Sequence, residues 1–171
     1  MIRNSPSQLV NDYEFVQSIR YKVTKFSHLR LYESMEEGDN RHKSELLFKM
    51  LKRDGFNVRK LKVVFDWKDL PIPHEVIRHL NRSGTLWVHT ILEVKIGGRW
   101  VKLDCTWNKE LERIGFPVTK NWDANSDTFQ VTKGVIEFHA AKNLKNIKRP
   151  LKEESKSFAL NLNDWLKRSY L

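Results

Sequence analysis

The chain has 171 residues, about the length of one domain, and 40% of them are hydrophobic, which excludes a globally disordered chain. A single Cys excludes a disulfide framework and a cage of several thiolates, and no apolar run reaches the roughly 20 residues of a membrane helix. The first residues also lack the apolar stretch of a signal peptide. We therefore expect a cytoplasmic protein that has no membrane partner.

Lys and Arg together number 31 against 21 Asp and Glu, which gives a net charge of +10. The excess lies mainly in two blocks, residues 41–70 and 133–171, each with nine basic and four acidic side chains. Such blocks can hold nucleic acid, or they can simply be solvated surface, and the charge alone does not decide between the two.

The first predicted elements are two helices. Apolar positions recur at steps of three and four within residues 8–31, and again from Asn40 to Asp54. The second helix ends before Gly55, which suits the left-handed cap position. His42 is predicted to lie at the surface of this helix. The inward stripe of the same helix is predicted to comprise Asn40, Ser44, Leu47, Phe48 and Leu51.

Strand patterns follow the second helix. Alternating apolar residues predict a strand near residues 58–67, and the prolines of the next segment exclude a central strand there. The β-rich runs 86–96 and 99–107 flank Gly97 and Gly98, and such a glycine pair predicts a hairpin because both turn residues take positive φ.

The rest of the chain completes an α+β fold. Residues 108–127 are predicted to form a loop with a short helical piece, residues 129–139 a further hairpin, and residues 155–170 a closing helix. We find no internal repeat and no linker-like stretch, so residues 1–171 are predicted to be a single domain. Its N-terminal helices and the helix that begins at Asn40 would pack on an antiparallel sheet.

The glycine turn also predicts the register of the hairpin, in which the numbers of opposed residues add up to 195. His89 and Asp104 are then diagonal neighbours on one face, roughly 7–8 Å apart between backbones, and their side chains can bridge that distance. An imidazole held in one tautomer by a carboxylate is what a general base requires, although a polar pair at a sheet rim is the simpler alternative. Cys105 points to the opposite face, and we interpret it as a small buried apolar residue.

Two segments, GDNRHKSELLFKMLKRDGFNVRKLKV and WVHTILEVKIGGRWVKLDCTW, resemble the core of the transglutaminase-like superfamily in order, spacing and helix–strand–hairpin context. The resemblance covers about residues 36–107 and implies a papain-like fold. Carried over to this sequence, it implies that His89 is the general base and Asp104 the carboxylate that orients it. Asn40 stands where the family has its nucleophilic Cys.

This departure governs the functional expectation. An amide side chain cannot be deprotonated to attack a carbonyl, so we expect the fold of a thiol acyltransferase or peptidase without turnover. Asn favours a helix start, where its oxygen accepts a backbone N–H. Ser44 lies one turn deeper, and we interpret it as a small packing residue. The sequence shows neither a helical pair of zinc-binding His nor a phosphate-binding glycine loop, so we expect no metal and no cofactor.

Two alternatives to an inactive enzyme-like domain stay open. One is a nucleic-acid-binding module that uses the basic blocks, with exposed Trp67, Trp107 or Trp122 as stacking surfaces and with salt-sensitive binding. The other is a protein- or peptide-binding groove that survives from a substrate cleft, between the helix that begins at Asn40 and the strand that contains His89.

Overall fold

The computed structural model describes residues 5–24, 35–134, 137–139, 147 and 149–170. Its helices are α1 (Pro6–Ser18), α2 (Asn40–Arg53), the short α3 (His74–Ile77) and α4 (Lys152–Ser169). Its strands are β1 (Arg20–Tyr21), β2 (Glu37–Gly38), β3 (Val58–Asp66), β4 (Leu86–Ile96), β5 (Arg99–Leu103) and β6 (Glu137–His139). Short 3-10 turns lie at Trp67–Asp69, Arg78–Leu80 and Lys109–Ile114.

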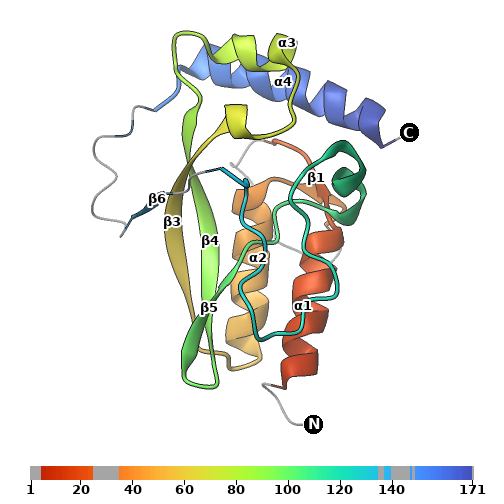
Figure 1. Cartoon of the computed structure of the whole chain (residues 1–171), viewed down its shortest axis with the longest axis vertical. Coiled ribbons are helices and arrows are strands. Elements are labelled where there is room, and N and C mark those ends of the chain that lie inside the picture. The colour runs from red at the N-terminus through yellow and green to blue at the C-terminus, as the bar shows by residue number, and fades with distance from the viewer. Residues whose placement is uncertain (1–4, 25–34, 135–136, 140–146, 148, 171) are drawn as a thin grey trace.

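The main sheet has the strand order β5-β4-β3-β6, and all of its pairs are antiparallel. A separate parallel pair joins β1 to β2. In Figure 1 the long strands β3 and β4 stand beside α1 and α2, and α3 and α4 lie together across the end of the sheet. The prediction of an α+β architecture with an antiparallel sheet is therefore confirmed.

Helix α1 is shorter than the predicted span of 8–31. It starts after Ser5, whose Oγ accepts a hydrogen bond from the Gln8 N–H at 3.1 Å, and it ends at Ser18. The chain then becomes extended, and the Tyr21 N–H donates to Asn108 Oδ1 at 2.9 Å. This tertiary hydrogen bond cannot form if the helix continues. Residues 25–31 of the predicted helix lie outside the described residues.

The predicted hairpin is confirmed in turn and register. Gly97 and Gly98 both have positive φ, 52° and 84°, and Leu92 pairs with Leu103 as the sum rule requires. Strand β5 ends at Leu103, earlier than predicted, and the N–H of the next residue, Asp104, donates to Thr128 Oγ1 at 2.8 Å.

The sheet has a hydrophobic cluster on each face. Ile91 and Leu92 are consecutive in β4, so their side chains point to opposite faces and enter different clusters. The Leu92 cluster is formed with α1 and α2 and includes Cys105. The Ile91 cluster is formed with α3 and α4 and includes Phe158 and Leu162. The two clusters fix both layers against the sheet.

The C-terminal elements agree in part with the sequence. The predicted closing helix is α4, and Phe158, Leu162 and Leu166 are fully buried along it. The hairpin predicted at 129–139 is wrong in its pairing, because β6 pairs with β3 and the described residues 129–134 contain no strand.

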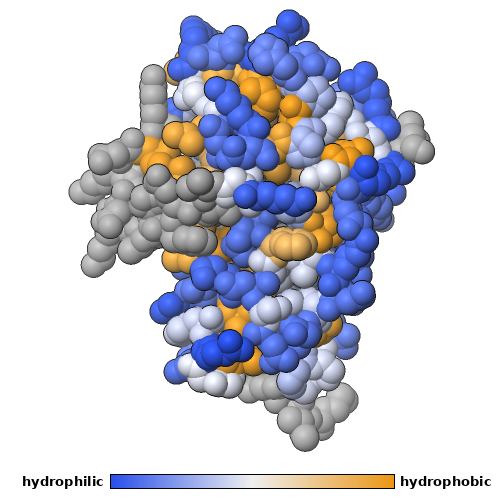
Figure 2. Space-filling model, in the orientation of Figure 1, coloured by the Kyte–Doolittle hydropathy of each residue, from blue (hydrophilic) through white to orange (hydrophobic). Residues whose placement is uncertain are grey.

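Hydrophilic side chains cover most of the face shown in Figure 2, and apolar side chains reach the surface in small areas between them. None of the helices in the described ranges combines the length and the apolar content that crossing a bilayer requires.

Candidate functional site

The centre of the site is a buried pair formed by His89 of β4 and Asp104, the residue directly after β5. His89 Nε2 lies 2.9 Å from Asp104 Oδ2, and each side chain is only 3% exposed. The hairpin register therefore brings the two predicted residues into direct contact. Thr106 completes the group, with its Oγ1 at 3.2 Å from His89 Nε2 and at 2.5 Å from Asp104 Oδ1.

The surroundings of Asp104 determine which nitrogen of His89 carries a proton. Burial works to raise the pKa of Asp104, but the positive charge and hydrogen bond of His89 and two hydrogen bonds from Thr106 hold this pKa below its ordinary value. Asp104 is therefore an ionised acceptor. Since a carboxylate can only accept, His89 Nε2 must donate, and in the neutral ring Nδ1 carries the basic lone pair.

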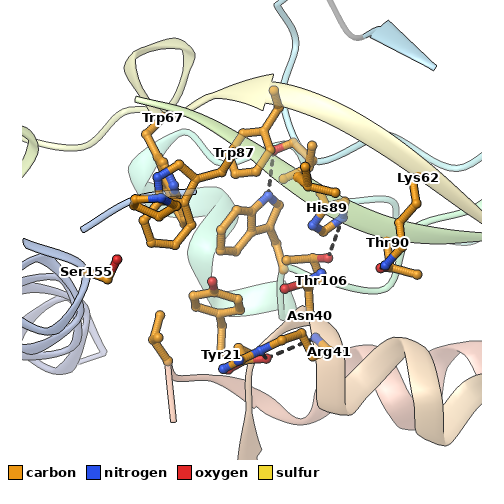
Figure 3. A pocket seen from close by; sticks show the side chains of 17 residues that line it. Tyr21, Asn40, Arg41, Lys62, Trp67, Trp87, His89, Thr90, Thr106 and Ser155 are labelled. Carbon is orange, nitrogen blue, oxygen red and sulfur yellow. Dashed lines mark hydrogen bonds and ion pairs between the residues drawn. The ribbon is translucent and has the colours of Figure 1, made fainter. Parts of the chain in front are cut away.

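His89 opens onto a pocket of about 460 Å³. In the close-up of Figure 3, Asn40 and Thr106 lie next to His89, while Trp67 and Trp87 form a wall further from them. His89 makes hydrogen bonds in the described structure only through Nε2, so Nδ1 is left to meet whatever occupies the pocket.

The second part of the site is the N-terminus of α2. Asp39, not Asn40, is the capping residue, and its Oδ1 accepts from the Arg41 N–H at 3.0 Å. Burial acts to raise the pKa of Asp39, but hydrogen bonds from His42 and Arg41 hold it well below its usual range. His42 is 7% exposed and its Nδ1 lies 3.0 Å from Asp39, so its predicted surface position is wrong.

Asn40 is the first residue of α2 and its half-buried side chain lines the same pocket as His89. The expected role for Asn40, capping its own helix, is wrong because Asp39 takes it. No hydrogen bond of the Asn40 side chain is found in the described part of the chain. The structure therefore places all three predicted site positions together: Asn40 and His89 at the pocket, and Asp104 behind His89.

Lys43 of α2 connects the segments that form the site. It was not identified from the sequence. Its side chain is fully buried, and its Nζ donates to the carbonyl oxygens of Gln17, Ile19 and Thr106 at 2.7–3.1 Å. Burial lowers the pKa of Lys43 to about 8. The ammonium thus ties α2 to the end of α1 and to the segment that contributes Thr106.

Of the predicted inward stripe of α2, Ser44, Leu47 and Leu51 are buried, while Asn40 and Phe48 are half-buried. Ser44 is 6% exposed, and its interpretation as a small packing residue stays a prediction.

The only thiol, Cys105, is buried in the cluster on the α1 and α2 side of the sheet, away from His89 as predicted. Burial raises its pKa to about 12. At pH 8.5 we expect iodoacetamide to label the folded chain about 1000-fold more slowly than the chain unfolded in guanidinium chloride, because both the thiolate population and access are low. Mass spectrometry of timed samples measures this ratio, and equal rates would contradict the buried position.

The indoles proposed for stacking are not exposed. Trp67, Trp107 and Trp122 are 2%, 3% and 5% exposed, so the prediction that they present faces to nucleic acid is wrong. The Nε1–H groups of Trp67 and Trp87 are buried, the described residues offer them no acceptor, and both residues line the pocket. Unsatisfied buried donors are costly, and an oxygen of a bound molecule would satisfy them.

Two further observations bear on the kind of site. Among the described residues, no cluster of three or more His, Cys, Asp or Glu is placed to hold a metal ion. Comparison with known proteins gives no significant match to any family model, curated protein or solved structure.

Sequence reasoning found the three central positions but missed their supports. Asp39 carried a usable signal, since Asp directly before a helix is a preferred cap. Thr106 was placed opposite His89 by the register but given no role. Lys43 carried no signal, because a Lys within a helix is rarely buried.

Proposed function

We propose that this chain has a transglutaminase-like fold in which Asn40 replaces the nucleophilic Cys, and that it uses the remaining pocket for binding and not for acyl transfer. The observation that carries the proposal is the buried contact of 2.9 Å between His89 and Asp104, beside a pocket that Asn40 also lines. A braced imidazole next to a helix start is what activation of a thiol would need.

The residues present account for the loss of turnover. His89 Nδ1 can accept a proton, but the Asn40 amide has no proton that it can give up to become a nucleophile at neutral pH. Thr106 Oγ1 donates to Asp104, so its hydroxyl is held by the carboxylate. The pocket keeps the positive end of α2 and the donors of its aromatic wall, which suit the oxygen of an acyl or amide group.

The Asn40→Cys variant tests this proposal with p-nitrophenyl acetate. The introduced thiol would lose its proton to His89 Nδ1 and its sulfur would attack the ester carbonyl, which forms a thioester and expels p-nitrophenolate. Water would then hydrolyse the thioester to acetate. We expect a burst of about one p-nitrophenolate per chain, as for other activated nucleophiles.

Two controls make the result specific. The parent chain, whose only thiol is Cys105, should give no burst. Adding His89→Ala to the Asn40→Cys variant should slow acylation by about 100-fold, since general-base assistance is worth that much. Turnover by the parent chain, or acylation that does not depend on His89, would refute the proposal.

We infer a cytoplasmic location from the cysteine content, since proteins of oxidising compartments often carry disulfides and this chain has a single Cys. The nucleic-acid alternative has lost its stacking residues and now depends on charge alone, so we do not adopt it as the proposed function.

A further inference from the structure

Strand β4 has a neighbour along only part of one edge. It pairs with β3 from Leu86 to Val94, but with β5 only from Leu92 onward. Strand β5 ends at Leu103, and the chain then leaves the ladder. Among the described residues, no strand pairs with residues 86–91 on this side of β4, and we call this stretch the open edge. It is exposed at Leu86 and Val88 and buried from His89 to Ile91.

The hydrogen-bond pattern shows which backbone groups point to this edge. The Thr85 carbonyl accepts from Trp67 at 3.1 Å and the Lys95 N–H donates to Asn57 at 2.8 Å, so the odd-numbered residues of β4 bond toward β3. The even-numbered residues direct their N–H and C=O groups to the open edge, and among residues 86–91 these are Leu86, Val88 and Thr90. No other backbone hydrogen bond to these three occurs within the described ranges.

The open edge lacks the usual protection against pairing. Native edge strands commonly carry a Lys, a Pro or a bulge. Residues 86–91 read LWVHTI, without Lys or Pro, and they pair with β3 in an uninterrupted register. Leu86 and Val88 are 54% and 39% exposed, which is unusual for large apolar side chains. An extended segment can add to such an edge as a further strand.

The candidate site lies along this same edge. Trp87, Val88, His89 and Thr90 line the pocket of about 460 Å³, and Trp87 and Val88 also line an adjoining pocket of about 350 Å³. Lys62 of β3 belongs to both pockets. An added strand would therefore run past His89 and along both pockets.

The charge of this region favours an acidic ligand. Lys62 Nζ donates to Thr90 Oγ1 of β4 at 2.6 Å, and Figure 3 shows the two side chains together. No carboxylate partner of Lys62 is found in the described residues. Arg149 is exposed beside the second pocket. Strands lie about 4.8 Å apart, so a Glu on the added strand and the Lys62 side chain can meet across β4.

We propose that the open edge of β4 binds an extended acidic peptide of a partner protein as an added antiparallel strand. The alternation of side chains along a strand sets its pattern: acidic residues on the face of Lys62, and apolar residues on the face of Trp87 and His89. The inference rests on the proposed function, in that it names the ligand class of the same pocket.

The probe is a fluorescein-labelled ten-residue peptide of alternating Glu and Val, titrated with the full chain and followed by fluorescence anisotropy. We expect a Kd below about 1 mM at physiological salt. The Lys and Val counterpart should bind at least about tenfold more weakly, because it meets Lys62 and Arg149 with like charge. The Glu and Val peptide with N-methyl groups on its Glu amides should also lose about tenfold, because the Glu residues lie opposite Val88 and Thr90 and their N–H groups are the donors that face β4.

The matching change in the protein is Val88→Pro, with Val88→Thr as its control. Proline removes one edge N–H and leaves the bonds to β3 in place, because Val88 bonds away from β3. Affinity should fall about tenfold for Val88→Pro and stay within about twofold for Val88→Thr. If Val88→Pro does not fold, the N-methylated peptide on the unaltered chain decides. Amide hydrogen exchange should show Val88 and Thr90 protected by the peptide.

Equal binding of the plain and N-methylated peptides would overturn the inference, and so would the absence of binding at a chain concentration of about 1 mM. It would also be overturned if a labelled single-stranded oligonucleotide bound more tightly and displaced the peptide. None of these outcomes changes the result expected from the ester assay of the Asn40→Cys variant. The absence of a p-nitrophenolate burst in that assay likewise does not change the result expected from the peptide titration. The two failures can therefore be told apart.

Discussion

Replacing Lys43 with Met is expected to lower the free energy of unfolding by about 3–5 kcal/mol, the usual cost of removing one partner from a buried charged network. Met keeps the apolar length of the side chain but leaves the carbonyl oxygens of Gln17, Ile19 and Thr106 without their donor. Each buried acceptor that loses its hydrogen bond lowers the free energy of unfolding. Urea unfolding at pH 7, followed by tryptophan fluorescence, measures the loss.

Lys49→Met is the matched control, since Lys49 lies on the same helix and is exposed. Its effect should stay within about 0.5 kcal/mol. A Lys43→Met variant as stable as this control would show that the three contacts contribute nothing.

A comparison of the unaltered chain with Lys43→Met at several pH values tests the lowered pKa of Lys43. The pKa of Lys43 is lowered by burial to about 8 from 10.5, so the unfolded chain binds more protons than the folded chain between these two values. The unaltered chain should therefore gain stability relative to Lys43→Met as the pH rises from 8 to 10. A constant difference across this window would contradict the lowered pKa.

Asp104→Asn is expected to cost about 2–4 kcal/mol, because donors reach both carboxylate oxygens and an amide offers only one acceptor. His89 Nε2 approaches Oδ2, and the N–H and hydroxyl of Thr106 approach Oδ1. The amide can keep its oxygen toward Thr106 only by turning its NH₂ group toward Nε2, which forces His89 into the other tautomer and replaces a charge-assisted hydrogen bond with a neutral one. Urea unfolding at pH 7 measures the effect, and the exposed Asp164→Asn is the control, with an expected change within about 0.5 kcal/mol.

Unfolding measurements at acid pH test whether the ionised carboxylate of Asp104 is the source of this stability difference. The Asp104 pKa is held below 3.8, so the stabilisation it gives is fully present above that value and is lost as the pH falls through the folded pKa. The stability difference between the unaltered chain and Asp104→Asn should thus narrow below pH 4. A difference that stays constant down to pH 3 would show that the ionised carboxylate is not its source.

How far the sequence predicted the site depends on how local each contact is. The contact between His89 and Asp104 was predictable because a two-residue glycine turn fixes which residues of a hairpin lie opposite one another. Position 40 was predictable through the family resemblance, and the structure adds that it lines the same pocket as His89. Family membership and function were predicted from that resemblance, and they stay predictions.

The wrong predictions share a cause. The long first helix followed apolar spacing that continues past Ser18, but a hydrogen bond from Tyr21 to Asn108, distant in sequence, ends the helical path. The hairpin at 129–139 followed local β propensity, but β6 finds its partner in β3. Local propensity carries no information about partners that are distant in sequence, and tertiary contacts with such partners override it.

By itself, the sequence determined the α+β composition, the helix α2 and the hairpin with its register, because these depend on side-chain period and on turn geometry over short distances. Only the tertiary structure decided that Lys43 is buried, that the three tryptophans named for stacking are covered, and that residues 86–91 keep an open edge. Each of these depends on which segments meet across the fold, and burial and pairing are properties of both partners, which a single segment does not specify.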